Sequence, residues 1–192
     1  MSFKLKGCIL WAGVIGAVIG VISVLAAEKV DELTSTAEFC GTSCHSMQTY
    51  VATEQTYVMS AHQTAYSGVH ATCSSCHISS GLVAATWDHI SAGIRDIISE
   101  MTNDFENPAE WEKLRSQLAY NVRDKLLKTN SANCRKCHDE SQIQPGFTRG
   151  KEEHELAQKK SITCIACHYN LVHKPVKPRE EFLKRAGVLP QK

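Results

Sequence analysis

Eight of the nine cysteines in this 192-residue chain stand in four short motifs, each closed by a histidine. The motifs occupy residues 40–45, 73–77, 134–138 and 164–168. Three read C-x-x-C-H, and the first has three residues between its cysteines. This pattern is typical of c-type haem attachment, in which two cysteines form thioethers to the porphyrin and the histidine faces the iron. The sequence therefore predicts four covalently bound c-type haems, attached through Cys40, Cys44, Cys73, Cys76, Cys134, Cys137, Cys164 and Cys167.

Two other uses of paired cysteines compete with haem. Zinc sites contain C-x-x-C pairs, and disulfides form in oxidising compartments. Neither requires a histidine directly after every second cysteine. Haem attachment explains the histidines. The first motif has one more residue between its cysteines, which affects the expected local geometry of the attachment more than the presence of the haem.

Each bis-histidine haem needs a second histidine from outside its motif. The candidates are His62, His70, His89, His154 and His173. His173 lies only five residues after His168, so we expect it to bind a neighbouring haem and to hold two haems close together. Met47 follows the first motif as C-H-x-M and is either a thioether ligand, which would raise the reduction potential, or a packing residue. His70 has no assigned role and is expected at the surface.

Composition narrows the classes of function. The formal net charge of +1 gives no indication of nucleic-acid binding. Only 7% of the residues are aromatic, so a conventional core is doubtful and the haems would supply much of the buried apolar material. We expect the apoprotein to be unfolded, as small metal domains are without their metal.

The first predicted element is an uncharged segment, residues 7–27, which is long enough to span a bilayer as a helix. Lys4 and Lys6 precede it, so the N-terminus should stay cytoplasmic and the haem motifs should lie in the periplasm. The alternative is a signal peptide cleaved after Ala27, although the apolar run is longer than such peptides usually have. Gly16 and Gly20 form one G-x-x-x-G, which would allow a homodimer.

Between the second and third motifs the chain predicts two helices. Over residues 83–102, four apolar residues recur at helical spacing: Ile90, Ile94, Ile97 and Met101. A second helix should begin at Asn107, with Pro108 in its first turn and Glu110 completing a capping pattern. Its apolar stripe is expected to pack on haem or on the first helix, or else to form a partner surface: Trp111, Leu114, Leu118 and Val122.

We therefore predict a mainly α fold with extensive loops, made of one N-terminal transmembrane helix and a haem-organised multihaem cytochrome c domain. Residues 1–30 would form a cytoplasmic stub and a transmembrane signal anchor in the inner membrane. Residues 31–175 would form the periplasmic tetrahaem domain. Residues 176–192 would be a C-terminal extension, and the Pro- and Lys/Arg-rich tail from Lys174 looks peripheral, like a docking strip.

Several segments resemble the NapC/NirT family of membrane-anchored tetrahaem quinol dehydrogenases. They are C-H-S-M at 44–47, V-M-S-A-H at 58–62, A-G-I-R-D at 92–96 and T-C-I-A-C-H-Y-N-L-V-H at 163–173. The resemblance covers about residues 5–175 and includes the anchor and the order of the motifs.

The resemblance implies an iron ligand set. Met47 rather than His45 would bind haem 1, and Asp96 would sit over its open face beside the quinol. The remaining pairs would be His77 with His173 at haem 2, His138 with His62 at haem 3, and His168 with either His154 or a ligand from a partner at haem 4. The family carries a lysine seven residues before the aspartate. This chain has His89 there, on the same helical face as Asp96.

The resemblance also implies a function. Such proteins oxidise membrane quinol, here menaquinol, and pass the electrons to a periplasmic multihaem or molybdenum reductase, such as a nitrite or nitrate reductase. Asp96 and His89 would accept the quinol protons. Three alternatives stay open: a terminal oxyanion reductase, an electron relay or haem sensor without a quinone site, and electron delivery into the quinone pool.

Overall fold

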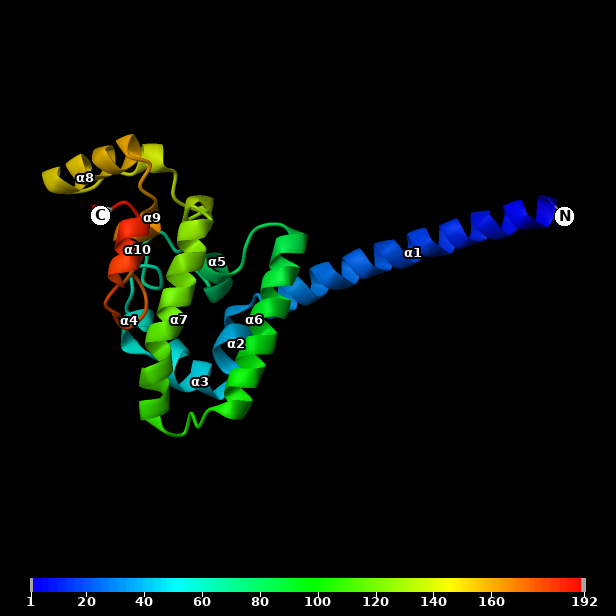
Figure 1. Ribbon diagram of the computed structural model, residues 1–192, viewed down its shortest axis with the longest axis horizontal. Helices are drawn as coiled ribbons and strands as arrows, with labels where there is room; N and C mark the ends of the chain where they lie inside the picture. Colours follow the sequence, from blue (N-terminus) through cyan, green and yellow to red (C-terminus); the bar gives the residue numbers. More distant parts are fainter. Residues whose placement is uncertain (1, 191–192) are drawn as a thin grey trace.

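The N-terminal helix stands apart from the rest of the chain. The computed structural model describes residues 2–190, and in it α1 (Ser2–Thr34) extends away from a domain that gathers at its C-terminal end (Figure 1). Within α1, Gly7–Thr34 is long and apolar enough to cross a membrane, and an 18-residue stretch of it has a mean hydropathy of 2.5. The helix continues unbroken through Ala26 and Ala27, beyond the predicted 7–27, and packs against a second long helix, as a retained anchor would.

The domain is built from helices and irregular segments, and residues 2–190 contain no β-strand. This agrees with the predicted mainly α fold with extensive loops. After α1 the elements are α2 (Ala37–Thr42), α3 (His45–Met47), the π-helical turn η1 (Gln48–Ala52), α4 (Gln55–Val58), α5 (Cys73–His77), α6 (Leu82–Thr102), α7 (Pro108–Lys128), the 3-10 turns η2 (Cys134–Lys136) and η3 (Glu140–Gln142), α8 (Thr148–Lys159), α9 (Cys164–Cys167) and α10 (Glu180–Arg185).

The two long helices of the domain, α6 and α7, match the predicted pair. At the start of α7, the Asn107 side chain accepts a hydrogen bond from the backbone N–H of Ala109 at 3.0 Å, and Pro108 occupies the first turn. The predicted capping role of Glu110 is wrong. Its carboxylate lies 2.6 Å from the Lys113 ammonium, one turn further along the helix.

The apolar core is small, as the low aromatic content predicts. Among the described residues the buried apolar side chains are Ala85, Phe105, Trp111, Ile165, Ala166, Val176, Phe182 and Ala186. Trp111 stacks on Tyr50 of η1 with ring centroids 5.2 Å apart, and Phe105 meets it edge-on. The stripe on α7 therefore begins against η1 and the loop after α6, whereas Leu118 further along is exposed.

The tail after Lys174 is packed and is not a free docking strip. Phe182 of α10 is only 2% exposed and meets Tyr169 edge-on. Arg179 and Arg185 both bind Asp124 of α7, so two ion pairs fix α10 against that helix. The pattern of prolines and basic residues did not indicate this packing, because the tail has few buried apolar residues and its arginines pair with a residue of another helix.

Candidate functional site: four cysteine motifs beside a membrane helix

Each cysteine motif lies on a short helical turn. In chain order, motif one occupies α2 and α3, motif two α5, motif three η2 and motif four α9. The turn of motif two is fixed by a reciprocal cap. The Thr72 hydroxyl accepts from the backbone N–H of Ser75, and the Ser75 hydroxyl accepts from that of Thr72. Such caps hold the thiols in place without a surrounding sheet.

Hydrogen bonds link consecutive motifs in chain order. The Ser74 hydroxyl of motif two donates to the linker between α1 and α2 at 2.8 Å, just before motif one. The Asn133 amide, next to motif three, donates to the carbonyl of Cys76 in motif two at 2.7 Å. The Thr163 hydroxyl, next to motif four, donates to the Ser131 hydroxyl near motif three at 2.7 Å. The four motifs therefore form a continuous series.

The thiols show the same order through their electrostatics. Contact with Cys73, and then burial, raises the pKa of the Cys40 thiol, and the same contact lowers the pKa of Cys73 to about 6. Burial and the neighbouring Cys76 raise the pKa of Cys134. Burial and Cys134 in turn raise the pKa of Cys164. Groups attached at consecutive motifs would therefore lie close together.

Three pairs of histidine rings lie close together in edge-on or tilted arrangements, and each pair joins a motif histidine to one from elsewhere in the chain. Their ring centroids are 6.0–6.2 Å apart. The pairs are His77 with His173, His138 with His62, and His168 with His154. These are the combinations that the family resemblance implies for haems 2, 3 and 4.

This spacing fits an iron ion held between two rings. Two metal–nitrogen bonds of about 2 Å, together with the two ring radii, give a centroid separation of roughly 6 Å. An open hollow of about 520 Å³ lies between the end of α1 and motifs two and three, lined among others by Asp31, Ser74 and Cys137 and by none of the paired histidines. The paired thiols and paired imidazoles, rather than this hollow, suit a covalently attached haem.

Partial burial favours the neutral form of three candidate imidazole ligands, His77, His168 and His173. It lowers the pKa of His77 to about 4, with His173 and Lys125 adding to the shift. It also lowers the pKa values of His168 and His173. Neutral imidazole is the form that binds metal, so these rings are ready to act as ligands near neutral pH.

Motif one differs from the other three. The Nε2 atom of His45 lies 3.7 Å from the Glu106 carboxylate, and the His45 side chain is 47% exposed. Met47, two residues on, is partly buried. Of the two candidate ligands at this motif, Met47 is thus the more enclosed.

Helix α6 lies beside motif one. Its Glu100 accepts hydrogen bonds from the backbone N–H and the hydroxyl of Ser46, which is buried. Asp96, one turn earlier, is close enough to act with burial and Glu100 in raising the pKa of the Cys44 thiol. The structure therefore brings Asp96 to the second attachment cysteine of motif one.

The surroundings of Asp96 raise the pKa of its carboxylate above the ordinary value. Although the residue is exposed at the domain surface, partial burial of its carboxylate raises its pKa. Arg95 opposes this shift and Glu100 adds to it. A carboxylate with a raised pKa is better suited to accept a proton near neutral pH than an ordinary aspartate.

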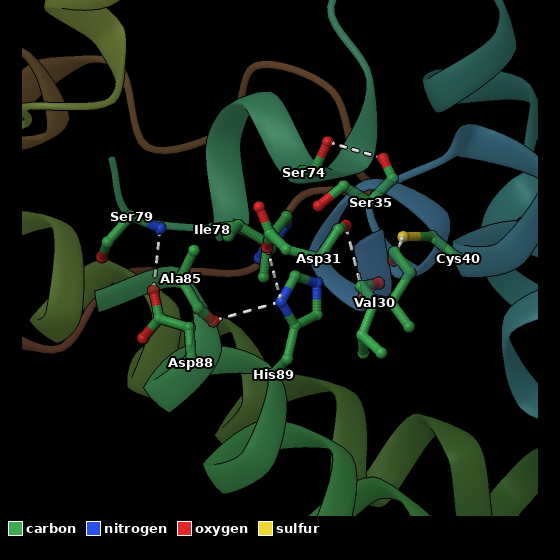
Figure 2. Close-up of polar contacts among 12 residues, drawn as sticks. Val30, Asp31, Ser35, Cys40, Ser74, Ile78, Ser79, Ala85, Asp88 and His89 are labelled. Carbon is green, nitrogen blue, oxygen red and sulfur yellow. Dashed lines mark hydrogen bonds and ion pairs between the residues drawn. The ribbon is translucent and has the colours of Figure 1, made fainter. Parts of the chain in front are cut away.

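His89 lies on the same face of α6, about 10 Å before Asp96 along the helix axis. Its Nδ1 atom is 3.1 Å from Oδ1 of Asp31, near the end of α1, and 3.1 Å from the carbonyl of Ala85 (Figure 2). Its Nε2 atom is buried and has no hydrogen-bond partner among the described residues. His89 thus contacts the membrane helix, whereas Asp96 lies by motif one.

Two site residues were not predicted from the sequence. Glu100 could have been found, because it lies four residues after Asp96 and so shares its helical face. Asp31 could not, because nothing in the spacing around α1 indicates which residue of another helix it meets. His70 is exposed, as expected for a surface residue.

The chain is similar to known proteins. Residues 3–178 match the NapC/NirT cytochrome c family, N-terminal region. A protein of Nitrosomonas europaea described as "Probable tetraheme cytochrome c-type" is 36% identical over 164 residues, covering 84% of this chain and 67% of the relative.

Two further relatives bear the family's names. The cytochrome c-type protein NapC of Escherichia coli K12 is 31% identical over 151 residues, covering 78% of this chain and 74% of the relative. The denitrification system component NirT of Stutzerimonas stutzeri is 28% identical over 167 residues, covering 83% of this chain and 79% of the relative. No solved structure matches the chain.

Proposed function

The chain belongs to the NapC/NirT cytochrome c family, and from this premise we propose that it oxidises membrane quinol and supplies the electrons to a periplasmic reductase. It is a membrane-anchored cytochrome c with an apolar helix, α1, at its N-terminus. Quinol as the electron donor, menaquinol in particular, and the reductase as the acceptor are the parts of this proposal that experiment must test.

The residues that would hold the haems follow from the motifs and the histidine pairs. Each pair of motif cysteines would form the two thioethers of one haem. His77 with His173, His138 with His62, and His168 with His154 would each bind one iron, as their ring separations support. At motif one the ligand would be Met47, with His45 as the alternative. When bound, the haems supply one-electron redox chemistry.

The observation that carries the quinol proposal is the position of α6. This helix packs against the membrane helix α1 at one end, where His89 contacts Asp31. Further along, it presents Asp96 beside Cys44 and Glu100 to Ser46 of motif one. A quinol entering from the membrane would therefore meet proton acceptors next to the first attachment motif.

Quinol oxidation releases two protons and two electrons and leaves quinone. We assign Asp96 as acceptor of one proton, because its raised pKa brings it closer to the working pH. His89 is the candidate acceptor of the other proton through Nε2, since its Nδ1 side already faces Asp31 and the Ala85 carbonyl, and because Nε2 is buried this transfer requires the ring to become accessible first. The Asp31 contact would fix the orientation of the ring toward the quinol oxygen.

The reductase would dock near motif four. The motifs follow one another from the α1 side of the domain, and α8 and α9 lie on the side away from α1 (Figure 1). His168, in motif four, is exposed there. An electron acceptor needs close approach to the last group in the series, so this surface is the natural contact.

The test is anaerobic haem reduction by a menaquinol analogue in detergent, followed by stopped-flow absorbance. We expect Asp96→Asn to slow the reaction by about 10²–10⁴-fold, the usual contribution of a general base. Asp104→Asn, an exposed aspartate beyond the end of α6, is the matched control and should react like the wild type. Equal rates in all three proteins would remove Asp96 from the quinol site.

A further inference from the structure

The outer face of α6 is apolar and exposed along its whole length. Its side chains are 50–84% exposed, and their spacing of three and four residues places them in one stripe. We call this stripe the outer face of α6: Val83, Trp87, Ile90, Ile94, Ile97, Ile98 and Met101. The opposite face, with Asp88, His89 and Glu100, contacts the rest of the chain.

A stripe of this size is unusual on a protein surface that faces only water. Soluble monomers rarely expose a large contiguous apolar patch, and one that persists along a whole helix marks a contact surface. Helices with one charged face and one strongly apolar face commonly lie in the plane of a membrane interface. We therefore expect the outer face to be covered by something that lies next to α6.

The neighbour is the membrane helix. Residues from the end of the uncharged run of α1 and from the start of α6 line an apolar groove of about 480 Å³: Ser23, Val24, Ala27, Leu82, Val83, Thr86, Trp87 and Ile90. Glu28 is the first charge after the apolar run. The groove therefore lies at the depth where α1 leaves the hydrocarbon, and the outer face continues from it.

The direction of α6 agrees with this depth. In Figure 1, α6 runs steeply across the direction of α1 and forms the edge of the domain on the side from which α1 leaves. If α1 crosses the bilayer, α6 lies along the membrane surface. Trp87, on the outer face, has the amphipathic ring that is enriched at membrane interfaces.

We propose that the outer face of α6 is immersed in the lipid interface of the leaflet on the domain side, as a second membrane contact besides α1. Lipid acyl chains cover its isoleucines, and the exposed Arg95 at its border meets lipid headgroups. The contact sets the depth and tilt of the domain against the bilayer. This inference requires α1 to be in the membrane but does not depend on quinol oxidation.

The test uses the full-length holoprotein in nanodiscs that contain one copy each and a phospholipid with a diazirine in its acyl chain. After illumination, adducts are mapped by peptide mass spectrometry. We expect adducts on α1 and on the outer face of α6. Phe147, which is 83% exposed but lies just before α8, is the internal control and should carry none.

Two outcomes would overturn the proposal. One is labelling of α1 with none on α6. The other is loss of α6 labelling together with α6-to-α6 cross-links in larger vesicles, which would mean that a second copy covers the face. Ile94→Lys with Ile97→Lys should abolish adducts on α6 and leave those on α1, and the unchanged haem spectrum would show that the variant is folded.

Discussion

The histidines of this chain divide into separable roles. Three pairs of rings lie with their centroids 6.0–6.2 Å apart, whereas His70 is exposed. At haem 4 the resemblance allows either His154 or a partner protein to supply the second ligand. Its ring centroid lies 6.0 Å from that of His168, which favours the local residue.

Removing His154 should therefore change the spin state of one haem. We expect His154→Ala to convert one of the four haems from low spin to high spin, because iron loses one of its two strong-field ligands. The measurement is electron paramagnetic resonance of the oxidised protein. His70→Ala is the matched control and should leave the spectrum unchanged. A spectrum of His154→Ala with no high-spin signal beyond that of the wild type would show that another group binds this iron.

At the residue scale, motif spacing alone predicts which cysteines form the thioethers, and the family resemblance adds the histidine partners. Both stay predictions. Spacing could not reveal that Asp31 meets His89, because this contact joins two helices more than fifty residues apart in sequence. It also could not reveal that the His45 ring turns toward Glu106. Contacts of this kind depend on how helices are placed, which no local pattern encodes.

Helices α6 and α7 are joined by one ion pair that also contacts motif two. Lys125 of α7 lies 2.8 Å from the Asp88 carboxylate of α6 and donates to the carbonyl of His77 at 2.9 Å. Burial would raise the pKa of Asp88, but the hydrogen bonds from Lys125 and Ser79 outweigh it and lower the pKa. The pair therefore favours the folded state only while Asp88 is ionised.

The contribution of Asp88 to the free energy of unfolding depends on pH. An aspartate with a lowered folded pKa stabilises the fold above its ordinary pKa of about 3.9, and this contribution is lost as pH falls through the lower folded value. We expect Asp88→Asn to lower the free energy of unfolding at neutral pH by about 1 kcal/mol, since Lys125 is partly exposed. Denaturant unfolding at neutral and acid pH checks this. A loss that persists undiminished in acid would contradict it.

The packed tail offers a second test at the scale of elements. Phe182 of α10 is 2% exposed, and its ring packs edge-on against Tyr169 in the segment after motif four. We expect Phe182→Ala to lower the free energy of unfolding by about 3–5 kcal/mol, the usual cost of removing a buried phenylalanine. Phe147→Ala, at an exposed site, should change it by less than about 0.5 kcal/mol. Similar effects in both would mean that the tail does not stabilise the domain.

The existence of α6 and α7 was predictable, because four apolar residues at helical spacing and the Asn107–Pro108 start are strong local signals. The direction in which α6 presents its apolar stripe was not. Periodicity tells which side chains share a face, but the same isoleucines would suit a core or a membrane surface. The helix α1 extends past the predicted membrane-spanning residues 7–27 to Thr34, and its last turns carry charges such as Lys29 and Glu32 that pair along the helix.

In the whole molecule, one membrane helix leads into a series of four attachment motifs. The small core agrees with the predicted haem-organised domain. The packing of the domain could not be predicted, because the cysteine motifs lie on short turns that are joined by loops. The order of the motifs in space follows their order in the chain, and α6 joins the membrane end to motif one. This layout suits electron entry at the membrane and exit on the far side.

The most direct test of this account is whether quinol reduces the protein at all. The wild-type holoprotein is mixed anaerobically with a menaquinol analogue, and the α-band of the haems is followed before a final addition of dithionite. Quinol donation predicts fast reduction by the analogue, blocked by a quinone-site inhibitor. Reduction by dithionite alone would contradict quinol oxidation and leave an electron relay or a haem sensor as the function.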